Sequence, residues 1–188
     1  MQTLAGVLDL ALGLAARPAA RAVTFEDVVR ELQEEVFGVA LRILGDRDAA
    51  ADATSATFLK AYRAFDRYEP GRPLRNWLLT IAVRESISQA RRATRERARR
   101  GPAEAAEHAA GPLRHEPEER ALEREEREAI RTAVAALPEL YRVPIVLRYF
   151  NDLSLDEIAA VTGRPSATVG VQLLRGRALL RAALEAKA

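Results

Sequence analysis

One segment near the C-terminal end of the chain has residue types suited to contacting a nucleic acid. Residues 155–162 have helical periodicity, and a second helix is expected to begin near Ser166. The small Ala159 allows two helices to cross closely, and Gly163 permits a left-handed backbone at the turn between them. This spacing predicts a helix-turn-helix, and the alternative is an ordinary helical hairpin.

In a helix-turn-helix the second helix projects the side chains at its start into the major groove of DNA. Arginines beside that helix are placed to bind phosphates, and Gln172 could pair with adenine. The candidate DNA-binding residues of this half are Arg164, Ser166, Thr168, Gly170, Gln172, Arg175 and Arg177.

Charge is strongly segregated along the 188 residues, although the formal net charge is only +2. Residues 71–100 carry 9 arginines against 2 glutamates, a net charge of +7. Residues 101–128 carry 4 arginines against 9 glutamates, a net charge of −5. Two basic zones around an acidic one suggest two contacts with a polyanion, and the alternative is a set of solvated arginine-rich helices.

Several kinds of chemistry are excluded or left without support. The chain has no cysteine, which rules out disulfides, thiolate zinc sites and a cysteine nucleophile. Its two histidines fall in the segment 101–117 without convergent ligands, so no metal and no cofactor is expected. No nucleophile–base pair or phosphate loop is evident, so the protein is not predicted to be an enzyme. No apolar run approaches the roughly 20 residues of a membrane span, and the composition favours a cytoplasmic protein.

Helices account for all of the periodic segments, and the predicted fold class is therefore all-α. Thr24 is an expected N-cap, Gly45 an expected helix end, and Asp46 or Asp48 an expected start of the next helix. A third helix is expected from about Leu74, and others over 118–137, 140–149 and 155–162. Pro144 is expected in the first turn of its helix, and Ser154 and Ser166 are expected to cap the last two.

The chain divides into two small helical domains joined by a flexible acidic linker. Residues 1–22 form an N-terminal extension with an expected helix over 1–16, and residues 23–100 form the first domain. The linker covers 101–117, and the helix-turn-helix domain covers 118–188. Large apolar side chains are limited because alanine is abundant, so each core is expected to be small.

Two blocks of this sequence resemble the bacterial extracytoplasmic-function (ECF) sigma factors. The run LPELYRVPIVLRY (137–149), with the helix-turn-helix after it, is similar to the domain of that family that reads the minus-35 element. DATSATFLKAY (52–62) resembles the helix that grips the polymerase clamp, and NWLLTIA (76–82) resembles the helix that reads and opens the minus-10 element. The resemblance covers about residues 24–100 and 118–186.

The resemblance implies a transcription initiation factor that binds core RNA polymerase and both promoter elements and helps to melt DNA. The implied minus-10 residues are Arg72, Arg75, Asn76, Arg84, Ser88, Arg91, Arg92 and Arg95. Trp77 is expected in the core rather than as a stacking platform. The implied polymerase-binding residues, on the clamp and flap sides, are Asp52, Ser55, Phe58, Lys60, Tyr62, Leu147 and Tyr149. Core packing is the alternative role for Phe58 and Tyr62, and also for the flap candidates Leu147, Tyr149 and Leu180. An anti-sigma factor is a further implied partner.

The sequence departs from the family pattern at positions that bear on these expectations. Ala51, Ser55 and Ala56 stand where acidic residues and glutamine are common, which bears on polymerase docking. Arg84 and Gly170 replace residues common in the two DNA-reading helices. Two alternative functions therefore stay open: a sigma-like DNA-binding regulator without productive polymerase docking, and a decoy held by a protein partner.

Overall fold

The computed structural model describes residues 24–68, 73–100 and 118–186, and every regular element within these ranges is helical. The all-α prediction is confirmed for these residues. The expected helix over 1–16, the linker 101–117 and Arg72 lie outside the described residues. The elements are α2 (Phe25–Leu44), α3 (Arg47–Ala64), the 3-10 helix η1 (Phe65–Arg67), α4 (Leu74–Arg100), α5 (Glu118–Ala136), α6 (Glu139–Tyr149), α7 (Leu155–Thr162) and α8 (Ser166–Glu185).

Most helix ends fall where the capping residues predict them. Thr24 and Asp27 form a capping box at the start of α2, and the Asp46 side chain accepts the Ala49 N–H at the start of α3. Gly45 and Gly163 end α2 and α7 in the left-handed region, with φ of 74° and 67°. These two positions need glycine because a Cβ is strained at such φ values.

The prediction for Pro144 is wrong: the residue lies in the middle of α6 rather than in its first turn. Proline has no N–H, so the Leu140 carbonyl four residues earlier loses its helical hydrogen bond. Arg164 Nη1 lies 3.5 Å from that carbonyl oxygen and offers it a weak replacement.

The prediction that Ser166 caps α8 is also wrong. Pro165 occupies the cap position, and Ser166 is the first residue of the helix. The Ser166 hydroxyl instead donates to an Asp156 carboxylate oxygen at 2.8 Å, which ties the start of α8 to the start of α7.

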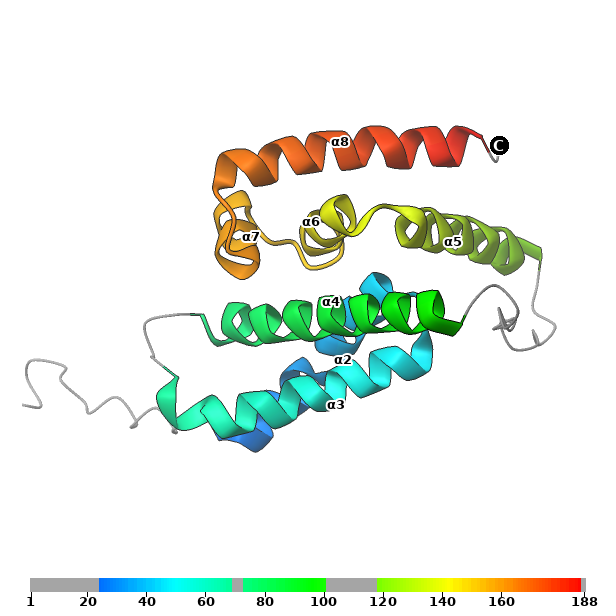
Figure 1. Cartoon of the computed structure of the whole chain (residues 1–188). Helices are drawn as coiled ribbons and strands as arrows, with labels where there is room; N and C mark the ends of the chain where they lie inside the picture. Colours follow the sequence, from blue (N-terminus) through cyan, green and yellow to red (C-terminus); the bar gives the residue numbers. More distant parts are fainter. Residues whose placement is uncertain (1–23, 69–72, 101–117, 187–188) are drawn as a thin grey trace, which may run out of the picture.

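The helices form two layers, with α2–α4 on one side and α5–α8 on the other (Figure 1). The first layer has its own core, where Val36, Ala61 and Leu78 are buried against Phe25, Phe58 and Trp77. Trp77 therefore packs in the core, as expected. Alanines at the α2–α3 crossing, among them Ala40, Ala50 and Ala53, let these two helices approach closely.

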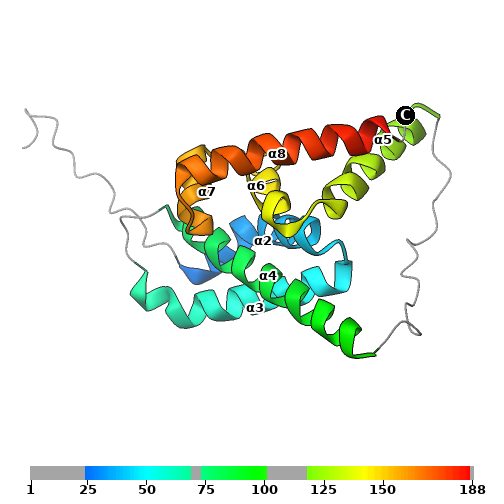
Figure 2. The ribbon, with the colours of Figure 1, turned by 45° about the horizontal axis from the view of Figure 1, so that its top comes forward.

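The largest apolar cluster belongs to both layers at once. α2 and α4 contribute Val39, Ile43, Leu79 and Val83, each at most 2% exposed. The second layer contributes side chains of α5, α6, α7 and α8 and the loop residue Leu153, all buried in the same cluster. Figure 2 shows α6 and α7 lying over α2 and α4. The sequence predicts two small cores joined by a linker, whereas in the structure the largest apolar cluster is shared by both domains.

Gly170 and Gly176 of α8 differ sharply in their surroundings, and this difference can be measured. A Cβ at Gly176 would lie 2.9 Å from Cγ1 of the buried Ile145, whereas a Cβ at Gly170 would meet nothing within 4 Å. Both alanine variants gain the same helix propensity, so their comparison isolates the steric cost. We expect Gly176→Ala to be less stable than Gly170→Ala by about 1–3 kcal/mol in urea unfolding. Equal stabilities would contradict the close α6–α8 packing.

Candidate nucleic-acid interface

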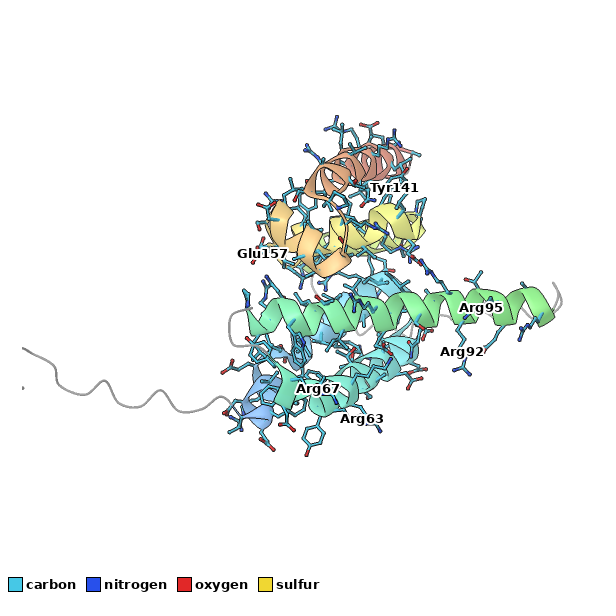
Figure 3. The ribbon with its side chains drawn as sticks, turned by 60° about the vertical axis from the view of Figure 1, so that its left-hand side comes forward. Arg63, Arg67, Arg92, Arg95, Tyr141 and Glu157 are labelled. Atoms are coloured by element: carbon cyan, nitrogen blue, oxygen red, sulfur yellow. The ribbon has the colours of Figure 1, made fainter. Side chains whose placement is uncertain are left out.

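Four of the predicted minus-10 residues form an exposed stripe on α4. Arg84, Ser88, Arg92 and Arg95 recur every three or four residues, so they lie on one face of the helix, and all four are exposed. Arg92 pairs with its neighbour Glu96 on the same helix, at 2.9 Å. Figure 3 shows Arg92 and Arg95 on the part of α4 that extends beyond the C-terminal domain. This basic stripe is accessible to a polyanion.

Arg75 lies at the contact between the two domains instead. Its guanidinium Nε donates to both Glu35 carboxylate oxygens, at 3.0 and 2.9 Å, and Nη2 donates to the backbone carbonyl of Asn151. Hydrogen bonding to Glu35 raises the pKa of Arg75 above its ordinary value. Asn151 Nδ2 donates to Glu35 at 2.8 Å, so one carboxylate joins α2, α4 and the loop after α6.

Asn76, the next residue of α4, makes a second polar contact between the domains. Its Nδ2 donates to Glu157 of α7 at 3.0 Å. This hydrogen bond, followed by those from the Ser154 backbone and hydroxyl, lowers the pKa of Glu157 from 4.5 to about 2. Figure 3 shows Glu157 on the side of the C-terminal domain that faces α4.

Other contacts between the two domains lie along the same interface, which we call the seam. Arg91 pairs with Glu139 at 2.9 Å, although the arginine is 64% exposed. Arg142 donates to the Ile43 carbonyl, and burial lowers the pKa of its guanidinium. Arg42 lies over the Phe150 ring at 4.4 Å, a cation–π contact. Three predicted DNA-binding residues, Arg75, Asn76 and Arg91, are thus engaged inside the chain.

The predicted minus-35 residues are divided between the surface and the interior. Thr168, Arg175 and Arg177 are exposed on α8, and Gly170 is half-buried. Gln172 is only 6% exposed, and its side-chain oxygen accepts from Arg164 Nη1 at 3.0 Å. Gln172 therefore does not face an incoming base in this arrangement, contrary to the expectation for adenine pairing.

The exposed surface of α8 also carries apolar residues that are not among the candidate DNA-binding residues. Val171 and Leu174 are 49% and 68% exposed. They lie three residues apart on the helix. Leu174 directly follows Leu173, which packs against the core, so the sequence pattern did not reveal that Leu174 points outward.

On the clamp side, the predicted residues of α3 are mostly accessible. Asp52 and Ser55 are exposed, and Tyr62 is 63% exposed with its ring edge-on to Phe25 at 5.2 Å. Phe58 is packed against the N-terminal core, so the alternative core role is the observed one. Lys60 pairs with Glu85 of α4.

A shallow groove between α2 and α3 adjoins this surface, and Ala51 and Ser55 are its lining residues that the sequence analysis singled out. Its lining residues are Gln33, Glu34, Phe37, Ala51, Thr54 and Ser55. The α2 members could not be recognised from the sequence because their periodicity is that of any amphipathic helix.

On the flap side, the two predicted residues differ in their exposure. Leu147 is fully buried in the core that both domains share, so the core alternative holds for it in this structure. Tyr149 is 52% exposed and lines a groove between α6 and α8 with Leu180 and Leu184.

The Asn76–Glu157 contact makes a pH-dependent contribution to stability. Because folding lowers the pKa of Glu157, that contribution is complete above pH 4.5 and declines as the pH falls toward 2. We expect Asn76→Ala to cost about 1 kcal/mol at pH 7, a modest value because the carboxylate is partly exposed. Urea unfolding should show this cost shrinking below pH 4.5, and a cost unchanged down to pH 3 would contradict the contact.

Two family models match this chain, one on each side of the seam. Sigma-70 region 2 matches residues 28–96, and Sigma-70 region 4 matches residues 127–180. No described helix has both the length and the apolarity needed to cross a membrane.

Curated relatives and solved structures agree with these models. The RNA polymerase sigma-H factor of Pseudomonas aeruginosa is 33% identical over 172 residues, 86% of each chain. The ECF RNA polymerase sigma factor SigW of Bacillus subtilis is 29% identical, over 84% of this chain and 87% of that protein. The sigma factor RpoE of Bartonella quintana, solved with the anti-sigma factor NepR, shares the fold with a TM-score of 0.70 at 24% identity, over 86% of this chain and 96% of that one. The chain belongs to the ECF RNA polymerase sigma factors and is a non-enzymatic transcription initiation factor.

Proposed function

We propose that this sigma factor binds core RNA polymerase, reads a minus-35 element with α8, and captures and melts a minus-10 element with α4. The observation that carries the proposal is the exposed arginine stripe of α4, in a chain that also holds a helix-turn-helix. Transcription initiation by this factor takes place in the cytoplasm, where polymerase and promoter DNA meet.

At the minus-10 element, the basic stripe binds the DNA backbone. Arg84, Arg92 and Arg95 neutralise phosphates, so binding weakens steeply with salt. The segment that captures a flipped base lies at the start of α4 and just before it, and it includes Arg72, Arg75 and Asn76. Flipping costs a few kcal/mol and is offset by a fitted pocket.

At the minus-35 element, the exposed residues of α8 enter the major groove. Thr168 and Arg175 lie on its accessible face and serve base and phosphate contacts respectively. Val171 and Leu174 add apolar surface that suits thymine methyl groups.

Core polymerase contacts both domains. The clamp meets α3 at Asp52, Ser55 and Tyr62, beside the groove that α2 and α3 form. The flap meets Tyr149 and the groove between α6 and α8. An anti-sigma factor is a further partner, because RpoE of Bartonella quintana, which shares this fold, is solved in complex with the anti-sigma factor NepR.

A transcription experiment tests the function as a whole. The purified chain is added to core polymerase with a pool of promoters, and the transcripts are sequenced. Specific start sites are expected. Polymerase binding without transcripts would identify a decoy, and DNA binding without polymerase binding would identify a separate regulator.

Reversing the charge of the exposed stripe should abolish promoter opening. We expect Arg92→Glu with Arg95→Glu to lower the yield of open complex at least about tenfold and to reduce the salt slope of DNA binding by about 2. Polymerase binding should be unchanged. The control is Arg30→Glu with Arg131→Glu, which changes the net charge by the same amount. Both arginines are exposed, and each pairs with an acidic residue of its own helix. Unchanged opening in the stripe variant would refute the assignment of α4.

Removing the Tyr62 ring should weaken polymerase binding. Tyr62 is 63% exposed, so Tyr62→Ala is expected to change thermal stability little while lowering affinity for core polymerase about tenfold. Tyr62→Phe keeps the ring and should bind nearly as well as the wild type. Equal affinities for the alanine variant and the wild type, measured by fluorescence anisotropy, would remove Tyr62 from the clamp surface.

A further inference from the structure

The outward face of α8 carries an apolar stripe. Its members recur every three or four residues, so they point in one direction from the helix, and all of them are exposed: Ala167, Val171, Leu174 and Ala178. We call these four residues the α8 stripe. Val171 and Leu174 are its large members, and they are 49% and 68% exposed.

The packing of α8 leaves this stripe uncovered. The helix packs inward through its buried residues Val169, Gln172 and Gly176. At about 100° per residue, these three lie on the opposite side of the helix from the stripe. Figure 1 shows α8 on the outer side of the second layer, away from α2–α4. The stripe therefore adds nothing to the core, and its apolar side chains are available to a binding partner.

Two arginines beside the stripe indicate that this partner is DNA. Arg175 and Arg177 are both exposed, and the helical rotation places one on each side of the stripe. In the major groove, the outermost face of a recognition helix meets the base edges, and its two sides reach the phosphates. A protein partner would also cover an apolar stripe, but it would not require a cation on each side.

Hydrogen-bonding side chains are missing from the centre of this face of α8. Gln172, whose amide could pair with adenine, is 6% exposed and accepts from Arg164 Nη1 at 3.0 Å. Gly170 beside the stripe has no side chain, and a Cβ added there would meet nothing within 4 Å. Base edges can therefore approach the stripe closely, but they meet apolar side chains there.

We propose that the α8 stripe selects the minus-35 sequence by the C5 methyl groups of thymine, with Val171 and Leu174 as the residues that determine specificity. The inference rests on the proposed function, because it names what α8 reads in the element. Among the bases, thymine alone presents a methyl group in the major groove. Another base at the same place would turn an unpaired polar edge toward an apolar side chain, which costs free energy.

The spacing of the two large side chains predicts where the thymines lie. Val171 and Leu174 are three residues apart, which corresponds to about 4.5 Å along the helix axis. Consecutive base pairs are about 3.4 Å apart. The two side chains therefore suit neighbouring base pairs, and the minus-35 element is expected to contain two adjacent A·T pairs at this point.

The test begins with a promoter pool in which the minus-35 and minus-10 regions are random. The chain with core polymerase selects promoters from this pool, and the bound DNA is sequenced. Two adjacent A·T pairs should be enriched in the minus-35 region. Each thymine of the enriched element is then replaced by deoxyuridine, which removes only the methyl group. The affinity of the wild-type holoenzyme should fall about fourfold for each methyl group lost.

A double variant assigns this effect to the stripe. Val171→Ala with Leu174→Ala shortens two exposed side chains, so the fold should be retained, and the variant should bind the thymine and uracil elements nearly equally. The matched control is Leu179→Ala, which shortens an exposed leucine of α8 that lies off the stripe. The control should discriminate between the two elements as the wild type does.

Equal binding of the thymine and uracil elements by the wild type would overturn the proposal. A double variant that still discriminates between them would also overturn it and would reassign the stripe to a protein partner. If the chain with core polymerase enriches no promoter sequence at all, the proposed function itself is contradicted, and this inference falls with it.

Discussion

The Glu35 carboxylate and the apolar core beneath it determine how the whole molecule is arranged. The carboxylate accepts from Arg75 and Asn151 at the rim of a core to which α2, α4, α5, α6 and α7 all contribute. A partly buried carboxylate is stable at such a place only when charged donors satisfy it. The apolar side chains supply attraction without direction, and the polar groups fix which residues of the two domains face each other.

This arrangement separates two roles within one helix. The first turns of α4 contribute Arg75, Asn76 and Leu79 to the contact with the second domain. The last turns extend past that domain and carry the exposed arginines Arg92 and Arg95 (Figure 3). A single basic block of sequence thus contains one part that is paired inside the chain and another that is free to bind a polyanion.

The helix-turn-helix shows the same division on a smaller scale. Gly163 makes the turn and Ser154 with Glu157 caps α7, all as the local sequence predicts. Gly176 lets α8 approach Ile145 of α6, a requirement that only the packing of the two helices reveals. Gln172 has the chemistry of a base-reading side chain, but Arg164 holds it in the interior.

The sequence by itself determined the helices, their caps, the helix-turn-helix and the family, because these depend on local periodicity, capping chemistry and short motifs. It placed most helix ends correctly and failed at Pro144 and Ser166, where Arg164 and Asp156 from other elements take part in the hydrogen bonding. It marked the arginines of residues 71–100 as one basic surface, since charge is visible in a sequence whereas its partners are not. Only the tertiary structure decided which of them are paired, because Glu35, Asn151 and Glu157 lie 40, 76 and 81 residues from the α4 side chains that they contact. Contacts at such separations depend on how the two domains pack, and no local pattern specifies that packing.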